Sequence, residues 1–197
     1  MKKRIVAGLA CYMIATTTQA DVVIGNPMAV TGPIPDLVAP MLPAVDLAAK
    51  HVNEQGGLFA NGEKLVIARV DSQCDPVAAV DAVTKLVNVN MVTAIVGPVC
   101  SGATIAQAES VSIPAGVVTL SVSASSPAIT NMESGTDLVF RAAASDAYQG
   151  VALAELAISK GIMDIAVSYA NDDYNAGIAE VFVKSYIKMG GKVTANE

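Results

Sequence analysis

Hydroxyl side chains follow two apolar runs of the sequence, at positions where a small charged molecule could be held. Ser101 comes after the β-branched run 94–96 and a Gly-Pro turn, and Ser123 and Ser125 come after the run 116–121. If the two runs are neighbouring parallel strands, about 4.8 Å apart, the loops that follow them reach the same molecule. Hydroxyls and backbone N–H groups suit a carboxylate, whereas hydroxyl lone pairs and carbonyl oxygens suit an ammonium group. This chemistry fits an α-amino acid held by its head group.

Two structural roles compete with this interpretation of the serines. Ser101 stands at the head of the next periodic segment and can cap that helix, and the serines within 123–126 can form a turn before Pro127. Spacing alone favours neither role, so both stay open at this point.

Three cysteines bear on the compartment of the protein. Cys11 lies in the amino-terminal segment 1–20, and removal of that segment leaves Cys74 and Cys100. An even pair in a chain bound for an oxidising compartment predicts a disulfide, which restricts the unfolded chain by about 3 kcal/mol on the loop-entropy account. Two buried free thiols are the alternative.

The amino terminus has the composition of a secretion signal. A basic tripeptide precedes an apolar run over 5–15, and a small residue, Ala20, stands where a signal peptidase would cut. We therefore predict that residues 1–20 are a removable signal peptide. An uncleaved membrane anchor and a lipoprotein signal at Cys11 are the alternatives.

Few residues can support catalysis or metal binding. His51 is the only histidine, and the 197 residues contain no G-x-S-x-G turn, no G-x-x-x-x-G-K-[ST] phosphate loop and no G-x-G-x-x-G dinucleotide motif. One histidine and a cysteine pair committed to a disulfide are too few ligands for a metal site. We therefore expect no enzyme activity, no cofactor and no metal.

The composition argues against nucleic acid as a partner. A net charge of −6 and a pI near 4.7 oppose contact with a phosphate backbone. Only 4% of the residues are aromatic and none is Trp, which leaves little for base stacking. Because 53% of the residues are hydrophobic, the chain has ample material for a core.

Strand-like and helix-like segments alternate along the chain. The predicted strands span residues 21–26, 64–71, 94–96, 116–121, 138–141 and 165–169, and the predicted helices span 40–55, 102–111 and 147–160, with one more starting at Pro76 and a last one that follows 172–174 and ends near 190. This alternation predicts the α/β class, with a parallel sheet covered by helices on both faces. The chain stops at 193–197, where another strand is expected, and we expect from this that the protein is incomplete.

Two aspartates are predicted to start helices. Asp75 is expected to cap the helix that begins at Pro76. Asp146 and Gln149 have the spacing of a capping pair for the helix over 147–160.

Several short motifs resemble those of one protein family. They are Asn53-Glu54-Gln55-Gly56-Gly57, Asp71-Ser72-Gln73-Cys74-Asp75-Pro76, Gly97-Pro98-Val99-Cys100-Ser101, Ser125-Ser126-Pro127, Phe140-Arg141 with Asp146 and Gln149-Gly150, and Asp173-Tyr174-Asn175-Ala176-Gly177. From about Val22 to its end, the chain is similar to the periplasmic leucine/isoleucine/valine-binding proteins, the substrate-binding components of branched-chain amino-acid ABC importers. The resemblance implies the type I periplasmic-binding fold, in which two α/β lobes joined by crossing strands close on a ligand by hinge motion. It places a first lobe at 21–141 and the start of a second, incomplete lobe at 142–197.

The same resemblance implies a set of functional residues. They are Ser101 and Ser125 for the ligand head group, Ser123 and Ala124 around a backbone contact, Tyr174 as a wall from the second lobe, and Cys74 with Cys100 as a disulfide. Ser123 stands where leucine binders have alanine, which makes the pocket slightly more polar. The loop over 26–33 is spaced differently from the family pattern, so no pocket residue is assigned there. Tyr174 is alternatively a core residue at a sheet edge.

We expect a periplasmic receptor that binds an aliphatic, branched-chain amino acid and hands it to an inner-membrane ABC permease, as a monomer. A binder of amides, urea or aromatic acids is an alternative within the family, and a sensory ligand-binding domain of the same fold is another. A secreted α/β hydrolase is a third alternative, although its catalytic partners are not visible in the sequence. The signal segment favours transport.

Overall fold

A computed structural model describes residues 20–58, 62–132 and 137–197. The predicted signal peptide therefore lies outside the described residues except for Ala20. Within the described ranges, none of the helices combines the length and the apolar character that crossing a bilayer requires.

A parallel sheet of five strands forms the first part of the molecule, in the order β2-β1-β3-β4-β5. The strands are β1 (Val22–Met28), β2 (Leu65–Asp71), β3 (Ala94–Val96), β4 (Val118–Ser121) and β5 (Val139–Arg141). The register places Ile24 of β1 opposite Ile67 on one side and Ala94 on the other. Because every neighbouring pair is parallel, all five strands end at the same edge of the sheet.

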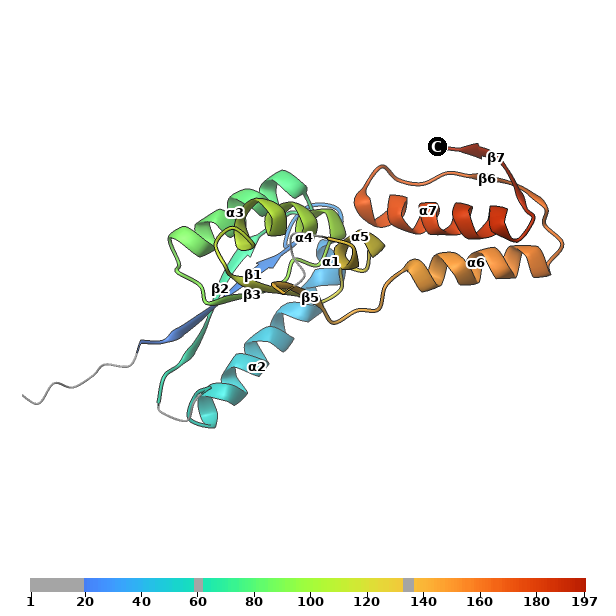
Figure 1. The fold of residues 1–197 in the computed structure, drawn as a ribbon. Coiled ribbons are helices and arrows are strands. Elements are labelled where there is room, and N and C mark those ends of the chain that lie inside the picture. Colours follow the sequence, from blue (N-terminus) through green and yellow to red (C-terminus); the bar gives the residue numbers. More distant parts are fainter. Residues whose placement is uncertain (1–19, 59–61, 133–136) are drawn as a thin grey trace, which may run out of the picture.

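Helices cover both faces of this sheet, as predicted (Figure 1). They are α1 (Pro35–Val38), η1 (Ala39–Met41), α2 (Leu42–Glu54), α3 (Pro76–Asn88), α4 (Ser101–Gln107), the π-helical turn η2 (Ala108–Ser112) and α5 (Pro127–Thr130). In Figure 1, α3 and α4 lie above the sheet and α2 lies below it. The predicted α/β class is confirmed.

A second, two-stranded parallel sheet follows, made of β6 (Asp164–Val167) and β7 (Lys192–Asn196). Strand β7 forms where the sequence predicts another strand. Helices α6 (Ala147–Ser159) and α7 (Asp173–Lys188) pack against each other, and both lie on the same side of this sheet in Figure 1. The division of the chain into lobes at 141/142 stays a prediction, which the presence of two separate sheets supports.

Separate apolar clusters stabilise the two parts. Leu86 of α3 packs with Ile95 of β3 and Val117, and all three are buried. In the second part, Phe182 and Tyr186 stack with ring centres 5.4 Å apart, and the Tyr186 hydroxyl donates to the carbonyl of Ile162 at 2.8 Å. Burying large aromatic side chains gives this smaller part much of its stability.

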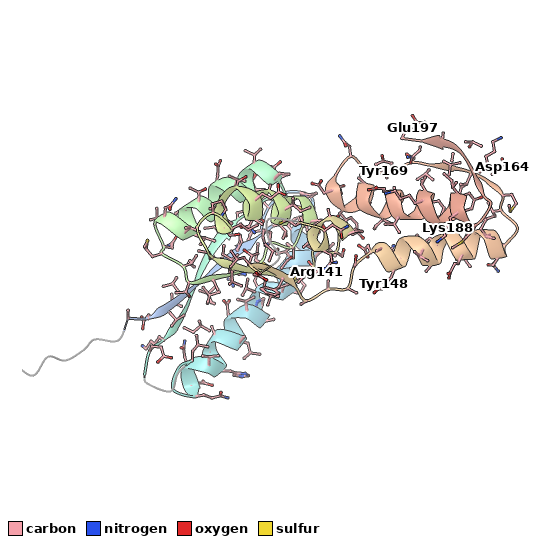
Figure 2. All side chains as sticks on the ribbon, viewed as in Figure 1. Arg141, Tyr148, Asp164, Tyr169, Lys188 and Glu197 are labelled. Atoms are coloured by element: carbon pink, nitrogen blue, oxygen red, sulfur yellow. A yellow bond between two sulfur atoms is a disulfide. The ribbon has the colours of Figure 1, made fainter. Side chains whose placement is uncertain are left out.

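Arg141 closes the first sheet where the chain crosses to α6 (Figure 2). Its guanidinium donates to the carbonyl of Ser126 at 2.8 Å and also to the Thr130 hydroxyl. The last strand of the first sheet is thereby fixed to both ends of α5.

The element boundaries differ from the predictions mainly at prolines and short helices. The helix predicted over 40–55 begins later, at Leu42, because Pro40 lies in the preceding 3-10 turn. Helix α5 begins at Pro127 and is capped by Ser126, and the sequence analysis predicts no helix over 127–130. The Asp75 cap is confirmed, since its carboxylate accepts the N–H of Ala78 at 2.8 Å.

Candidate functional site

The loops that follow β3 and β4 meet directly. Ser101, the first residue of α4, is buried, and its hydroxyl oxygen accepts the backbone N–H of Ser126 at 3.2 Å. The residue at the cap position of α4 is Cys100, so Ser101 does not fill that position. Ser126 instead caps α5 through the N–H of Ala128 at 3.3 Å. The structure therefore brings together the two loops that the sequence singles out, and it gives the capping role to Ser126.

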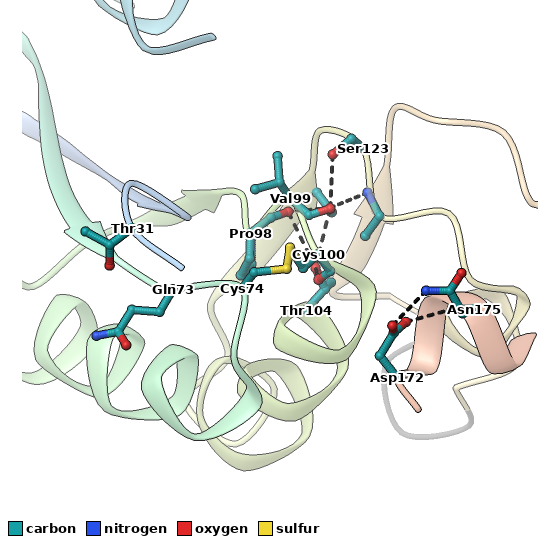
Figure 3. Close-up of a disulfide and its surroundings, with 12 residues drawn as sticks. Thr31, Gln73, Cys74, Pro98, Val99, Cys100, Thr104, Ser123, Asp172 and Asn175 are labelled. Atoms are coloured by element: carbon teal, nitrogen blue, oxygen red, sulfur yellow. Dashed lines mark hydrogen bonds between the residues drawn. A yellow bond between two sulfur atoms is a disulfide. The ribbon is translucent and has the colours of Figure 1, made fainter. Parts of the chain in front are cut away.

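Hydroxyl groups from the end of β4 and from the loop after it hold the loop after β3 in place. Ser121 donates to the carbonyl of Pro98 at 2.6 Å, and Ser123 donates to the carbonyl of Val99 at 3.0 Å (Figure 3). Ala124 is buried, and its N–H donates to the Ser121 hydroxyl at 3.1 Å. In this structure Ser121 and Ser123 therefore brace the two segments against each other, and Ala124 is held by a bond within its own segment.

Ser125 contacts a carboxylate that comes from a third strand end. Its hydroxyl donates to Asp146 Oδ2 at 2.5 Å, and the N–H of Asp146 donates to the Ser125 carbonyl at 2.9 Å. Asp146 holds the cap position of α6, but its side chain makes no cap hydrogen bond. The predicted capping pair of Asp146 and Gln149 is therefore wrong, because the carboxylate is turned to the serine loop.

Asp146 is the functional candidate that the sequence analysis missed. It follows β5, which lies next to β4 at the edge of the sheet. A signal was present, since a carboxylate after the third of three neighbouring strands belongs to the same edge as Ser101 and Ser125. The local spacing to Gln149 suggested a cap instead.

Tyr174 lies near the start of α7 and is 41% exposed, so it is not a buried core residue. It lines a cavity of about 670 Å³ in the second part of the molecule. That cavity is lined mainly by apolar residues of α6, β6 and α7, among them Leu153, Leu156, Ile165, Tyr169 and Phe182. Ser101, Ser123 and Ser125 do not line this cavity.

Cys74 and Cys100 form the predicted disulfide, with their Cα atoms 5.4 Å apart. The bond joins the loop after β2 to the loop after β3, directly before Ser101 (Figure 3). Gln73 and Cys74 both have a left-handed backbone conformation, with φ of 54° and 56°. The cross-link thus fixes a tight turn at the edge where the strands end.

Asp71 ties the loop after β1 to the end of β2. Its carboxylate accepts the N–H groups of Val30 at 3.0 Å, Thr31 at 3.3 Å and Gln73 at 2.9 Å, and the Thr31 hydroxyl at 2.5 Å. Burial raises the pKa of Asp71, but the Thr31 hydroxyl and the three N–H donors together outweigh it and hold the pKa below its usual value. The loop over 26–33, to which no pocket residue was assigned, is therefore anchored at the same edge.

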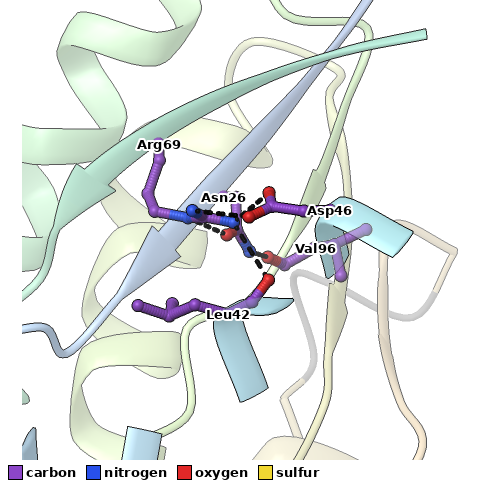
Figure 4. A network of polar contacts seen from close by, with 5 residues as sticks. All are labelled: Asn26, Leu42, Asp46, Arg69 and Val96. Atoms are coloured by element: carbon purple, nitrogen blue, oxygen red, sulfur yellow. Dashed lines mark hydrogen bonds and ion pairs between the residues drawn. The ribbon is translucent and has the colours of Figure 1, made fainter. Parts of the chain in front are cut away.

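A polar network below this edge joins α2 to the sheet (Figure 4). Asn26 is fully buried in β1 and donates to the carbonyl of Val96 at 2.8 Å. Arg69 donates to the Asn26 side-chain oxygen at 3.0 Å, to Asp46 at 2.8 Å and to the carbonyl of Leu42. Because each buried polar group has a partner, the network fixes the relative positions of β1, β3 and α2.

A row of buried polar side chains supports α4 from the sheet side. Gln107 donates to the Thr119 hydroxyl at 3.4 Å, and Thr119 donates to Ser112 at 3.0 Å. Thr104 bonds back to the carbonyl of Cys100 at 2.9 Å. These residues are all fully buried, so the end of α4 and the turn η2 rest on a hydrogen-bonded layer.

The segments that follow β3, β4 and β5 thus contribute two hydroxyl groups and the carboxylate of Asp146. Ser101 comes from β3, Ser125 from β4 and Asp146 from β5. A hydroxyl donor suits a ligand carboxylate, and a carboxylate with a hydroxyl oxygen suits an ammonium group. Among the residues that the structure describes, no group of three or more His, Cys, Asp or Glu side chains is arranged to hold a metal ion.

Comparison with known proteins places these features in context. The family model described as "Receptor family ligand binding region" matches residues 40–197. A leucine-, isoleucine-, valine-, threonine- and alanine-binding protein of Pseudomonas aeruginosa is 32% identical over 194 residues, which are 98% of this chain and 49% of that protein. An amino acid binding protein of the same organism is 31% identical over 180 residues, covering 91% of this chain and 47% of its own length.

A solved structure has the same arrangement of elements. It is the branched-chain amino acid transporter substrate binding protein LivJ of Streptococcus pneumoniae in complex with isoleucine, with a TM-score of 0.74 and 28% identity. The match covers 90% of this chain and 49% of LivJ. The chain therefore spans about half the length of the relatives that it matches.

Proposed function

This chain belongs to the receptor ligand-binding-region family, and from that premise we propose that it binds an aliphatic, branched-chain amino acid for transport. It holds the amino acid without chemical conversion and hands it to an inner-membrane ABC permease. It works in the periplasm as a monomer after loss of residues 1–20.

The observation that carries this proposal is the meeting of Ser101, Ser125 and Asp146 at one edge of the sheet. Ser101 accepts an N–H through its oxygen, so its own proton can be donated to a ligand carboxylate. Ser125 donates its proton to Asp146, so its remaining lone pairs can accept from an ammonium group. A carboxylate and an ammonium group bonded to the same carbon atom are the common part of every α-amino acid.

Tyr174 and the first turn of α7 supply the opposite wall in this proposal. Helix α7 contacts both α4 and α5, which carry or adjoin the serine loops. The names of the relatives, which include leucine, isoleucine and valine binders, support an aliphatic side chain on the ligand.

Titration of the chain over residues 21–197 with single amino acids tests the proposal. Calorimetry measures the heat, and ¹H–¹⁵N NMR spectra detect weak binding at millimolar ligand. We expect the N–H signals of Ser101, Gly102 and Ser125 to move with L-leucine, L-isoleucine or L-valine and to stay in place with D-leucine. Shifts with benzoate or urea alone would assign the site to another solute, and no shift with any of them would refute amino-acid binding.

A further inference from the structure

Two helical glycines lie where the two parts of the molecule touch. Gly102 is the second residue of α4, and Gly177 lies early in α7. Neither has a left-handed φ, so the backbone conformation does not call for glycine at either position. Glycine destabilises a helix relative to alanine, so its presence needs another reason.

Close packing between the parts supplies that reason. A Cβ on Gly177 would lie 2.9 Å from Ser126 Oγ and 3.0 Å from Pro127 Cδ. A Cβ on Gly102 would lie 2.5 Å from Asp173 Oδ2. Side chains do not normally come this close, so a methyl group at either position requires a neighbouring group to move.

The two contacts differ in how easily they can yield. Ser126 is fully buried and caps α5, and the Pro127 ring is rigid, so neither can move away from a methyl group on residue 177. The Asp173 carboxylate is the free end of an exposed side chain and can rotate away from residue 102. The observed position of α7 therefore requires glycine at residue 177 more strictly than at residue 102.

The contact at Gly177 adjoins the candidate site. Ser126, which it touches, donates its N–H to Ser101. Asp172, the cap residue of α7, bonds to Asn175 in the first turn of that helix (Figure 3), and Tyr174 lies between them in sequence. Helix α7 contacts both α4 and α5, so in the proposed site the distance between α7 and Ser126 sets the separation of the two walls.

We propose that Gly177, assisted by Gly102, is a positioning residue that seats α7 on the Ser126 loop and so sets the separation of the two walls of the binding site. This inference rests on the proposed function for its effect on affinity. The claim that Gly177 sets the position of α7 on the Ser126 loop does not depend on a ligand.

The test uses the chain over residues 21–197 and measures both the position of α7 and the affinity for an amino acid. Spin labels on cysteines placed at the exposed positions Lys85 and Lys188 report the distance between α3 and α7 by double electron–electron resonance, because the native cysteines are bonded to each other. Gly177→Ala should lengthen or broaden this distance and weaken leucine binding about tenfold. Gly102→Ala should have a smaller effect, which Asp173→Ala in the double variant should reverse.

Glu180→Ala is the matched control on the same helix, since Glu180 is exposed and pairs only with Lys184 in the next turn. It should change neither the distance nor the affinity. Wild-type distance and affinity in Gly177→Ala would overturn the proposal. If that variant does not fold, failure of Asp173→Ala to reverse a Gly102→Ala shift would overturn it. An unchanged wild-type spectrum with every amino acid would refute the proposed function, whereas the distances would still decide the positioning role.

Discussion

The hydroxyl group of Ser101 bonds to the backbone of Ser126 and can also bond to a ligand. Its oxygen accepts the N–H of Ser126, which is a structural task, and its proton can serve a ligand. The sequence offered a cap as the competing role, but the cap position belongs to Cys100. Measuring the affinity of a variant for the ligand can separate the two roles of Ser101, because only the binding role depends on the ligand.

Ser101→Ala should weaken amino-acid binding by about 1 to 3 kcal/mol, since the carboxylate of the ligand loses a donor in a buried place. Ser112→Ala is the control, because Ser112 is equally buried on η2 and bonds to Thr119 away from the loops. Calorimetry should show a loss of affinity in the first variant alone. Equal affinity in both variants would show that Ser101 holds the Ser126 loop and does not bind the ligand.

Asp71 makes the stability of the loop after β1 depend on pH. Its pKa is lower in the folded protein than in the unfolded chain, so its stabilising effect is full above the unfolded value of about 3.9 and disappears as the pH falls through the folded value. Asp71→Asn should lower the free energy of unfolding at pH 7 by up to about 1 kcal/mol, a modest amount because solvent screens a partly exposed carboxylate.

Urea unfolding at pH 7 and at pH 3 checks this sign. The difference between wild type and Asp71→Asn should be larger at pH 7 and shrink at pH 3. A difference that grows toward acid pH would contradict the assignment of the hydrogen bonds to the ionised carboxylate.

Among the elements, the strands and the longer helices were predictable, and the shortest helices were not. Strands β1 to β5 follow from short apolar runs bounded by turn residues, and the longer helices, such as α2 and α3, follow from apolar periodicity. Helices α1 and α5 have only four residues each, too few to show a period. The π-helical turn η2 falls within the helix predicted over 102–111 and cannot be distinguished from α-helix by pattern.

The site was predictable in part, for a similar reason. The placement of Ser101 and Ser125 follows from the ends of adjacent strands, which sequence order and parallel pairing predict. The bond between Ser125 and Asp146 joins residues 21 apart in sequence, and the close approach of Gly177 to Ser126 joins α7 to the cap of α5. Such pairings depend on how elements pack, which no local pattern contains.

The disulfide acts at the level of the elements that it joins, the loops after β2 and β3. Because Cys74 and Cys100 are 26 residues apart, replacing both by serine should lower the free energy of unfolding by about 3 kcal/mol. Urea unfolding of Cys74→Ser/Cys100→Ser measures this, with reduced wild type as the control that should match it. A variant as stable as oxidised wild type would show that the loops are held by their other contacts.

In the whole molecule, the two sheets differ in how well their strands are covered. Strand β1 is paired on both sides, whereas β6 is paired with β7 alone and borders the apolar cavity. A two-stranded sheet is only marginally stable without further packing.

The match to the receptor ligand-binding-region family and to leucine, isoleucine and valine binders confirms the resemblance predicted from the motifs.

Amide hydrogen exchange should therefore be uneven across the molecule. We expect the amides of β6 and β7 to exchange well before those of β1 and β3, because the second sheet opens locally at a lower free energy. Mass spectrometry of peptides from each sheet measures this in a single sample, with β1 as the internal standard. Equal protection of β1 and β6 would contradict the expected difference in local stability.

The bond between Cys74 and Cys100 also bears on how the protein is prepared. Recombinant material made in a reducing cytoplasm would carry a free Cys100 thiol directly before Ser101 and a second at Cys74, and its binding loop would lack the tether to the turn at Gln73. The choice of expression host therefore decides which form of that loop a titration measures, and exported or reoxidised protein is the appropriate sample.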